Sequence, residues 1–305
     1  MRWRAASGTH VMNTQPFHDG ELEAQRRAGE SERARSNGRA IADGIVPGAL
    51  SFVGRQPLFL AATLDPAGRP WAWLVAGAPG FVQAPSAREV RVHDVLLSAA
   101  LRTQLAADER IGLLFFEPAT RRRLRVNGNA RLTDDGGLEI AVVQAFPNCP
   151  KYIQRRALAA SAPAPGTPRA SQGTGLTPDL AARIARADTL FVASRGADGV
   201  LDVSHRGGVP GFVALRADGS LLVPDYPGNS MFNTFGNLLR DPRSSLLFPD
   251  FERGDVLRLI GRASVDFDHR ADGTAEFATG RAWSFATAEW RLEESALPFR
   301  LVRLP

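Results

Sequence analysis

The chain has 305 residues, of which 44% are hydrophobic and 23% are charged. This composition is typical of globular proteins, and the length is sufficient for two domains with their own cores. No apolar run approaches the roughly 20 residues that a transmembrane helix needs. The basic residues at the N-terminus are not followed by an apolar segment, so we expect no secretory signal, and Met12 is a second candidate for the start.

The cysteine and histidine content narrows the chemistry further. Cys149 is the only cysteine, which excludes an intrachain disulfide and favours a reducing, cytoplasmic location. The five histidines are scattered without the spacing of metal ligands, so we expect no metal site.

The net charge is +5, and all 37 basic residues except Lys151 are arginine. Planar arginine suits phosphate groups. The basic residues are spread among 32 acidic ones, without the basic stripe and interleaved aromatics that indicate nucleic acid. We therefore expect a small phosphorylated ligand, and we give equal weight to a GC-rich genome as the source of the arginine excess.

In chain order, residues 18–43 are polar and indicate one or two surface helices within an N-terminal extension, residues 1–45. Residues 58–143 alternate short β-rich runs with turn signals, interrupted by a predicted helix over 94–106, and form the core of a first repeat, residues 46–158. Residues 159–177 have the composition of a linker. A helix starts at Thr177-Pro178, and a second β-rich region over 189–268 belongs to a second repeat, residues 178–305.

An internal repeat organises the whole chain. An offset of 131 residues places 59–82 on 190–213 without a gap, and an offset of 133 places 112–130 on 245–263. In the first stretch Gly77, Pro79, Gly80, Phe81 and Val82 meet Gly208, Pro210, Gly211, Phe212 and Val213. The chain therefore contains two copies of one fold.

Each copy reads as about six short antiparallel strands with one inserted helix, a pattern that indicates a small split or closed β-barrel. Helices do not alternate with the strands, which disfavours a parallel doubly wound sheet. We predict a mainly β fold of two tandem split barrels related by pseudo-two-fold symmetry. A ligand is expected in the cleft between them.

The two copies differ at matched positions. Trp73, Leu74 and Val75 of the first copy correspond to Ser204, His205 and Arg206 of the second. The second copy also has a polar, glycine-containing stretch, residues 224–234, where a strand leads into a helix. Free backbone N–H groups with hydroxyl and amide donors make such a junction an anion site. We therefore place a phosphate in the second copy.

Each of these residues also fits a simpler role in the fold. Asn229, Ser230 and Thr234 are each, taken alone, better explained as helix caps. The stretch 204–208 is also compatible with a surface loop, because it ends in Gly-Gly. His205 has no nucleophile or acid at a familiar spacing, so no catalytic residue is assigned.

Several of these stretches resemble the pyridoxamine 5'-phosphate oxidase-related family of FMN-binding split barrels, in a tandem-barrel subgroup sometimes fused to ferredoxin-reductase modules. The resemblance rests on residues 202–213, 224–238 and 257–263, and on 16–21, 120–128 and 148–154. It implies that the chain binds FMN, with Arg206, Asn233, Thr234 and Arg258 near the cofactor. The resemblance and the polar stretches together predict these cofactor-binding residues: Ser204, His205, Arg206, Gly207, Asp225, Tyr226, Asn229, Ser230, Asn233, Thr234 and Arg258.

The predicted function is an FMN-dependent oxidoreductase of unknown substrate. Its predicted partner is a small-molecule redox substrate or electron donor, and a separate reductase is an open candidate for the donor. We expect it to bind neither nucleic acid nor a membrane. A homodimer stays open. The alternative is a non-catalytic flavin- or haem-binding or interaction module of the same fold, with His205 the one candidate axial ligand within the motif.

Overall fold

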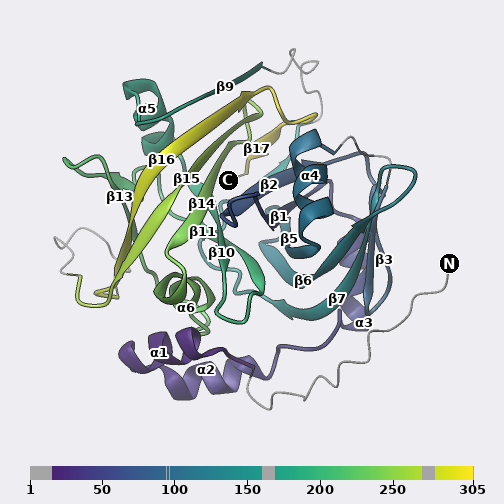
Figure 1. Cartoon of the computed structure of the whole chain (residues 1–305), viewed down its shortest axis with the longest axis horizontal. Helices are drawn as coiled ribbons and strands as arrows, with labels where there is room; N and C mark the ends of the chain where they lie inside the picture. Colours follow the sequence, from purple (N-terminus) through teal and green to yellow (C-terminus); the bar gives the residue numbers. More distant parts are fainter. Residues whose placement is uncertain (1–15, 94, 96, 160–168, 270–278, 305) are drawn as a thin grey trace.

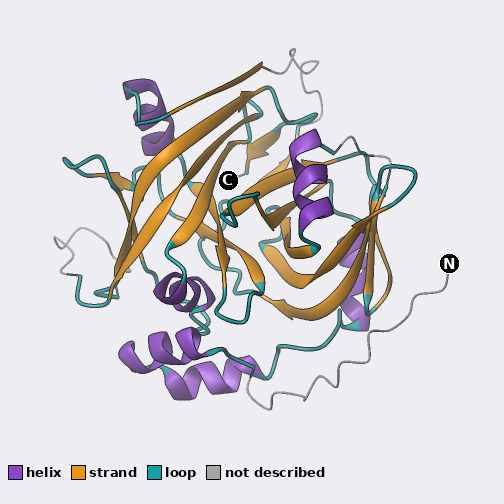
Figure 2. Ribbon diagram, viewed as in Figure 1, coloured by secondary structure: helices purple, strands orange, loops and turns teal. Residues whose placement is uncertain are grey.

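Two β-barrels lie side by side in the computed structural model, which describes residues 16–93, 95, 97–159, 169–269 and 279–304 (Figures 1 and 2). The first barrel contains helices α3 (Pro47–Gly54) and α4 (Ala99–Ala107) and seven strands. The strands are β1 (Leu58–Leu64), β2 (Pro70–Ala76), β3 (Val82–Ser86), β4 (Glu89–Val92), β5 (Arg110–Glu117), β6 (Arg122–Leu132) and β7 (Leu138–Pro147). They form an antiparallel sheet in the order β2-β1-β5-β6-β7-β4-β3.

The second barrel contains α5 (Pro178–Arg186) and α6 (Asn233–Arg240). Its strands are β10 (Thr189–Arg195), β11 (Leu201–Gly207), β12 (Ala214–Leu215), β13 (Leu221–Pro224), β14 (Arg243–Asp250), β15 (Asp255–Asp266) and β16 (Ala282–Glu294). Their order is β11-β10-β14-β15-β16-β13-β12, with β9 (Arg169–Gly173) added beside β16. The short strands β8 (Arg156–Leu158) and β17 (Leu301–Arg303) form a separate pair.

The two strand orders are the same once each strand is matched to its copy, which confirms the predicted tandem barrels. The matching extends to detail. Both long central strands carry an irregularity at equivalent places, at Asn127/Gly128 and at Ile260/Gly261. The Gly-Phe turns also match, because Gly80 and Gly211 each have φ +90°, a conformation that glycine adopts without steric cost.

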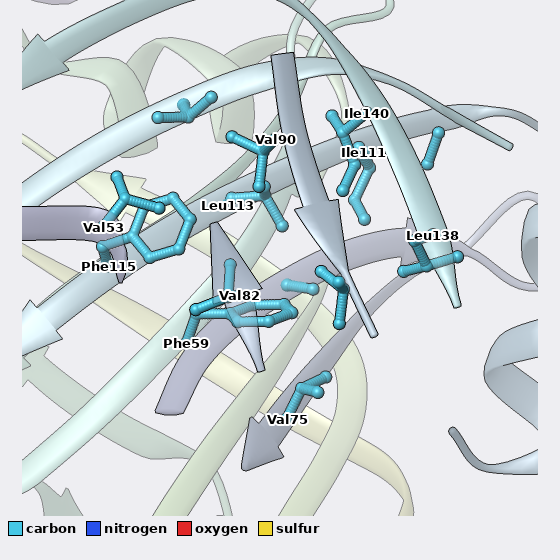
Figure 3. Packing of buried hydrophobic residues seen from close by; sticks show 14 of the residues in the cluster. Val53, Phe59, Val75, Val82, Val90, Ile111, Leu113, Phe115, Leu138 and Ile140 are labelled. Carbon is cyan, nitrogen blue, oxygen red and sulfur yellow. The ribbon is translucent and has the colours of Figure 1, made fainter. Parts of the chain in front are cut away.

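Apolar side chains fill each barrel and the space between the barrels. In the first barrel, Phe59 stacks on Phe81 with ring centroids 5.7 Å apart, among the valines, leucines and isoleucines of Figure 3. A separate cluster joins β1 and β5 to β10 and β14, and in it Phe116 meets Phe191 edge-on. The barrels are therefore held together by a shared apolar interface, which fixes the position of one barrel relative to the other.

Two predicted elements differ from the structure. The helix expected over 94–106 begins at Ala99, because the Ser98 hydroxyl accepts a hydrogen bond from the Leu101 amide and so caps it, while the proposed cap Asp94 lies outside the described residues. Part of the predicted linker, residues 169–173, is strand β9, since its backbone pairs with β16, and residues 160–168 lie outside the described part.

The N-terminal helices α1 (Asp19–Arg27) and α2 (Ser31–Gly38) precede the first barrel in sequence, but α1 packs against α6 of the second barrel (Figure 1). Helix α2 contacts the loop before α6, where Asn37 donates to the carbonyl of Asn229. Among the described residues, no helix is long and apolar enough to cross a membrane.

Candidate functional site

A polar cavity lies where the two barrels and the N-terminal helices meet. The second barrel contributes β11, the loop before α6, the start of α6 and Arg281. The first barrel contributes β6 and the segment after β7, and Glu30 comes from the turn between α1 and α2. Ten of the eleven predicted site residues line this cavity: Ser204, His205, Arg206, Gly207, Asp225, Tyr226, Asn229, Ser230, Asn233 and Thr234.

Arg258, the eleventh, lies elsewhere. Its Nε donates to the carbonyl of Ala72 at 2.5 Å, and its guanidinium lies 4.7 Å from the Trp73 ring, beside a different pocket. The residue at the cavity is instead its repeat equivalent, Arg125. Each long central strand reaches across to the other barrel, so the arginine at a given site comes from the opposite copy.

The loop that leads into α6 has an unusual backbone. Ser230 and Phe232 have φ values of +61° and +59°, a backbone conformation that residues other than glycine rarely adopt. The next residues, Asn233 and Thr234, open α6 and line the cavity. Thr234 is 1% exposed, and its hydroxyl has no hydrogen-bond partner among the described residues. A buried hydroxyl without a partner is costly, and a ligand oxygen would satisfy it.

The cavity has more positive than negative groups. Arg281 is paired with both acidic residues of the lining, at 2.9 Å to Asp225 and 2.9 Å to Glu30. Arg125 is paired with Asp202 at 2.9 Å. The three remaining cations of the lining, Arg123, Lys151 and Arg206, have no carboxylate within ion-pair distance in the part of the chain that the structure describes.

Arg123 is held by a histidine rather than by an acid. Its Nη1 donates to Nδ1 of His205 at 3.0 Å, and because arginine only donates, the neutral ring carries its proton on Nε2. Burial, together with Arg123 and Arg206, keeps the pKa of His205 well below its usual value. Burial and the nearby Arg206 and Arg125 lower the pKa of Arg123 to about 9, so it stays cationic at neutral pH.

Sequence reasoning missed part of this lining. Arg123 and the segment 148–152 come from the first barrel, and Glu30 comes from the N-terminal helices. Arg281 lies in the second barrel but far along the chain from the recognised motif. The runs 120–128 and 148–154 already stood out in the sequence, and their place at the cavity depends on how the barrels dock.

The pocket beside Arg258 is the pseudo-symmetric counterpart of the cavity. Val75 occupies the position of Arg206, and Trp73 that of Ser204, so apolar side chains replace the polar ones. Arg258 and Arg291 both approach Glu293, at 3.6 and 3.1 Å. Both matched pockets therefore contain arginines, Arg169 among them in this one, but only the cavity has a serine and an arginine at the positions of Ser204 and Arg206.

A comparison with protein-family models found a match to the part of the chain that forms the first barrel. The model described as pyridoxamine 5'-phosphate oxidase matches residues 46–165. This stretch belongs to the pyridoxamine 5'-phosphate oxidase family. It covers the whole first barrel, and the second barrel repeats the strand order of that domain. The comparison with curated proteins gave no match.

Solved structures similar to parts of the chain include three bacterial proteins. HupZ of Group A Streptococcus is 16% identical over 37% of this chain and 89% of its own, with a TM-score of 0.30. A NimC/NimA family protein of Clostridium acetobutylicum is 15% identical over 41% and 91%, with a TM-score of 0.30. A protein of the same organism related to general stress protein 26, of the pyridoxinephosphate oxidase family, is 17% identical over 40% and 90%, with a TM-score of 0.28.

Proposed function

We propose that this chain binds FMN in the cavity between its barrels and acts as a flavin-dependent oxidoreductase. The observation that carries the proposal is the pair Arg123 and Arg206, two guanidinium groups that line the cavity without a carboxylate partner among the described residues. A phosphate monoester is close to dianionic at neutral pH and forms charge-assisted hydrogen bonds with arginine. Membership of residues 46–165 in the pyridoxamine 5'-phosphate oxidase family supports the same ligand class.

The residues present fit a flavin nucleotide. The unpartnered Thr234 hydroxyl and the start of α6 would hold the phosphate with Arg206 and Arg123, because helix N-terminal N–H groups favour an anion. Tyr152 and Tyr226, with ring centroids 5.0 Å apart, line the same cavity and would add an aromatic wall. When bound, FMN would supply one- and two-electron redox chemistry, while the protein binds and orients it.

The alternative ligand is haem, and it depends on His205. Nε2 of His205 is buried and has no partner among the described residues, so it is the nitrogen that could ligate iron once it has lost the proton that the Arg123 hydrogen bond leaves on it. Against this, the ring is stacked on Phe116 at 5.2 Å, is edge-on to Phe191 at 5.5 Å, and bonds Arg123. A packed histidine whose other nitrogen orients an arginine favours the flavin proposal, since it keeps a cation aimed at the cavity.

The absorption spectrum of the purified protein tests the proposal. We expect a yellow protein with a band at about 450 nm, as flavins absorb. A colourless preparation should acquire that band when FMN is added and excess is removed. A Soret band would favour haem, and failure to retain FMN under either condition would contradict the proposal. The substrate class is a small redox-active molecule, and a separately encoded reductase remains part of the proposal as the electron donor.

A further inference from the structure

We propose that Glu21, on the N-terminal helix α1, is a positioning residue for the anion-binding cavity and acts on it through Asn233 and Arg125. The inference rests on the proposed function, because it takes the phosphate of FMN as the ligand. Glu21 does not line the cavity itself. It lies behind the wall, 5% exposed, beside a smaller polar pocket that Asp202 and Asn233 also line.

Helix α1 is fixed on α6 by direct backbone contact. A Cβ atom on Gly20 would lie 2.3 Å from the carbonyl oxygen of Gly236, and one on Gly236 would lie 2.5 Å from the amide nitrogen of Glu21. Only glycine permits this approach. His18 then bonds Asn237 through Nε2 at 2.8 Å. The contact brings the Glu21 carboxylate to the first residue of α6.

From Glu21 a chain of hydrogen bonds runs to the cavity wall. The side-chain amide of Asn233 donates to Glu21, and its carbonyl oxygen accepts from Nη1 of Arg125 at 3.0 Å. Arg125 also donates to the Ser204 hydroxyl. Because arginine only donates, the orientation of the Asn233 amide is determined by Arg125 on one side and by Glu21 on the other. Arg125, Asn233 and Ser204 all line the cavity.

The cluster contains one buried cation and two buried carboxylates. Glu21 is faced by His18 on its own helix, Arg125 from β6 and Asp202 from β11. Burial raises the pKa of Glu21 to about 7, against the opposing effects of His18 and of the Asn233 hydrogen bond. The charge of this carboxyl group therefore changes near neutral pH. The change alters the strength of its hydrogen bond with the Asn233 amide and its electrostatic attraction to Arg125.

Other residues of α1 and α2 form hydrogen bonds with the backbone of the loop that leads into α6. Nε2 of Gln25 donates to the carbonyl of Met231 at 3.0 Å, and Nδ2 of Asn37 donates to that of Asn229 at 2.7 Å. Neither bond involves Glu21, so we expect both to remain when Glu21 is changed. Loss of Glu21 should therefore leave the loop docked, while it removes both the bond to Asn233 and the bond that the Glu21 carboxylate accepts from the His18 amide at the start of α1.

A double-mutant cycle tests the route through Asn233. FMN dissociation constants are measured for wild type, Glu21→Ala, Asn233→Ala and the double variant. We expect Glu21→Ala alone to weaken binding by roughly tenfold, and to have less than about a twofold effect in the Asn233→Ala background. Additive effects would overturn the proposal. Asp19→Asn is the matched control, because Asp19 is an exposed acid of α1 paired with Arg240, and it should leave affinity unchanged.

A ligand-free measurement separates this inference from the proposed function. The Nε–H resonance of Arg125, assigned by its disappearance in Arg125→Lys, should shift as pH crosses neutrality in wild type and should not shift in Glu21→Gln. The same titration in both proteins would overturn the positioning role whether or not FMN binds. Failure of wild type to bind FMN, with the shift present, would instead remove the FMN proposal and keep the Glu21–Asn233–Arg125 coupling.

Discussion

At the scale of single residues, Arg123 and Arg206 are the most informative groups in the molecule. Removing a cation from water costs several kcal/mol unless a partner compensates. Neither arginine has a carboxylate partner among the described residues, and each lowers the pKa of His205, which stays neutral and orients Arg123. Asp225 favours the charged form of Arg206 from beyond ion-pair distance, and an anion in the cavity would favour the charged forms of both arginines further.

Arg206→Ala and Thr234→Ala should each weaken FMN binding, with the arginine change larger. A hydrogen bond to a charged group contributes about 1.5–3 kcal/mol, whereas the neutral Thr234 hydroxyl contributes less. Flavin fluorescence during titration of each apo variant measures the effect. Val75→Ala, the repeat equivalent of Arg206, should leave affinity unchanged. Arg125→Ala should weaken binding, because Arg125 lines the cavity. Equal affinity in wild type and Arg206→Ala would exclude the assigned phosphate position.

Glu21 should make the protein less stable as pH rises. Its folded pKa of about 7 exceeds the usual 4.5, so over this interval the folded protein keeps a proton that the unfolded chain has released. Stability therefore falls as pH rises through the window between the two values, and the full cost of the buried charge is present above it. Urea unfolding at several pH values should show a shallower fall for Glu21→Gln. Parallel curves for the two proteins would contradict the raised pKa.

The candidate site was predictable from the sequence wherever the relevant residues are local. Residues 204–207 and 225–234 come together because one strand and one strand-to-helix loop carry them. Arg258 was predicted at the second copy's site but lies at the other pocket. The sequence does not reveal that each long central strand reaches across to the opposite barrel. Glu30 could not be found, since nothing in its local sequence indicates that α1 and α2 dock on the second barrel.

At the scale of secondary-structure elements, turns and helix contacts depend on a few glycines. The paired offsets of 131 and 133 residues predicted two copies of one barrel, because Gly and Phe recur at turns that every copy needs. The docking of α1 on α6 had no such signal. It depends on Gly20 and Gly236, which are single residues in unrelated segments.

Gly211→Val should destabilise the protein even without ligand. Gly211 has φ +90°, and an added Cβ would meet nothing within 4 Å, so the cost comes from the backbone alone. Left-handed conformations cost other residues about 1–2 kcal/mol, and more for a β-branched one. Thermal unfolding should show the loss, while Val209→Ala, on the exposed part of the same turn, should change little. An unchanged melting temperature for Gly211→Val would contradict this reason for the glycine.

Gly236→Ala should disturb α1 although alanine favours helices. The added methyl would lie 2.5 Å from the Glu21 amide nitrogen, so the two helices must separate. We expect lower thermal stability and faster proteolysis of the N-terminal helices. Gly48→Ala is the control, because its Cβ would meet nothing within 4 Å and alanine is favoured in a helix by about 1 kcal/mol. Equal stability of the two variants would argue against close docking of α1.

At the scale of the whole molecule, a symmetric architecture carries an asymmetric pair of sites. The pseudo-two-fold relation creates two matched pockets, and only one has the Arg206 and Thr234 donors. In the other, Val75 and Leu101 stand at those positions. The arginines of that pocket are Arg169, Arg258 and Arg291, and the last two lie within ion-pair distance of Glu293. We therefore predict one FMN for each chain rather than two.

Titration of apo protein with FMN, followed by flavin fluorescence and by the protein-bound absorbance after gel filtration, distinguishes one site from two. We expect saturation at one FMN per chain, with binding strongly weakened in Arg206→Ala and unchanged in Val75→Ala. Saturation at two equivalents, or binding that responds to Val75→Ala and not to Arg206→Ala, would contradict a single flavin site in the second barrel's cavity.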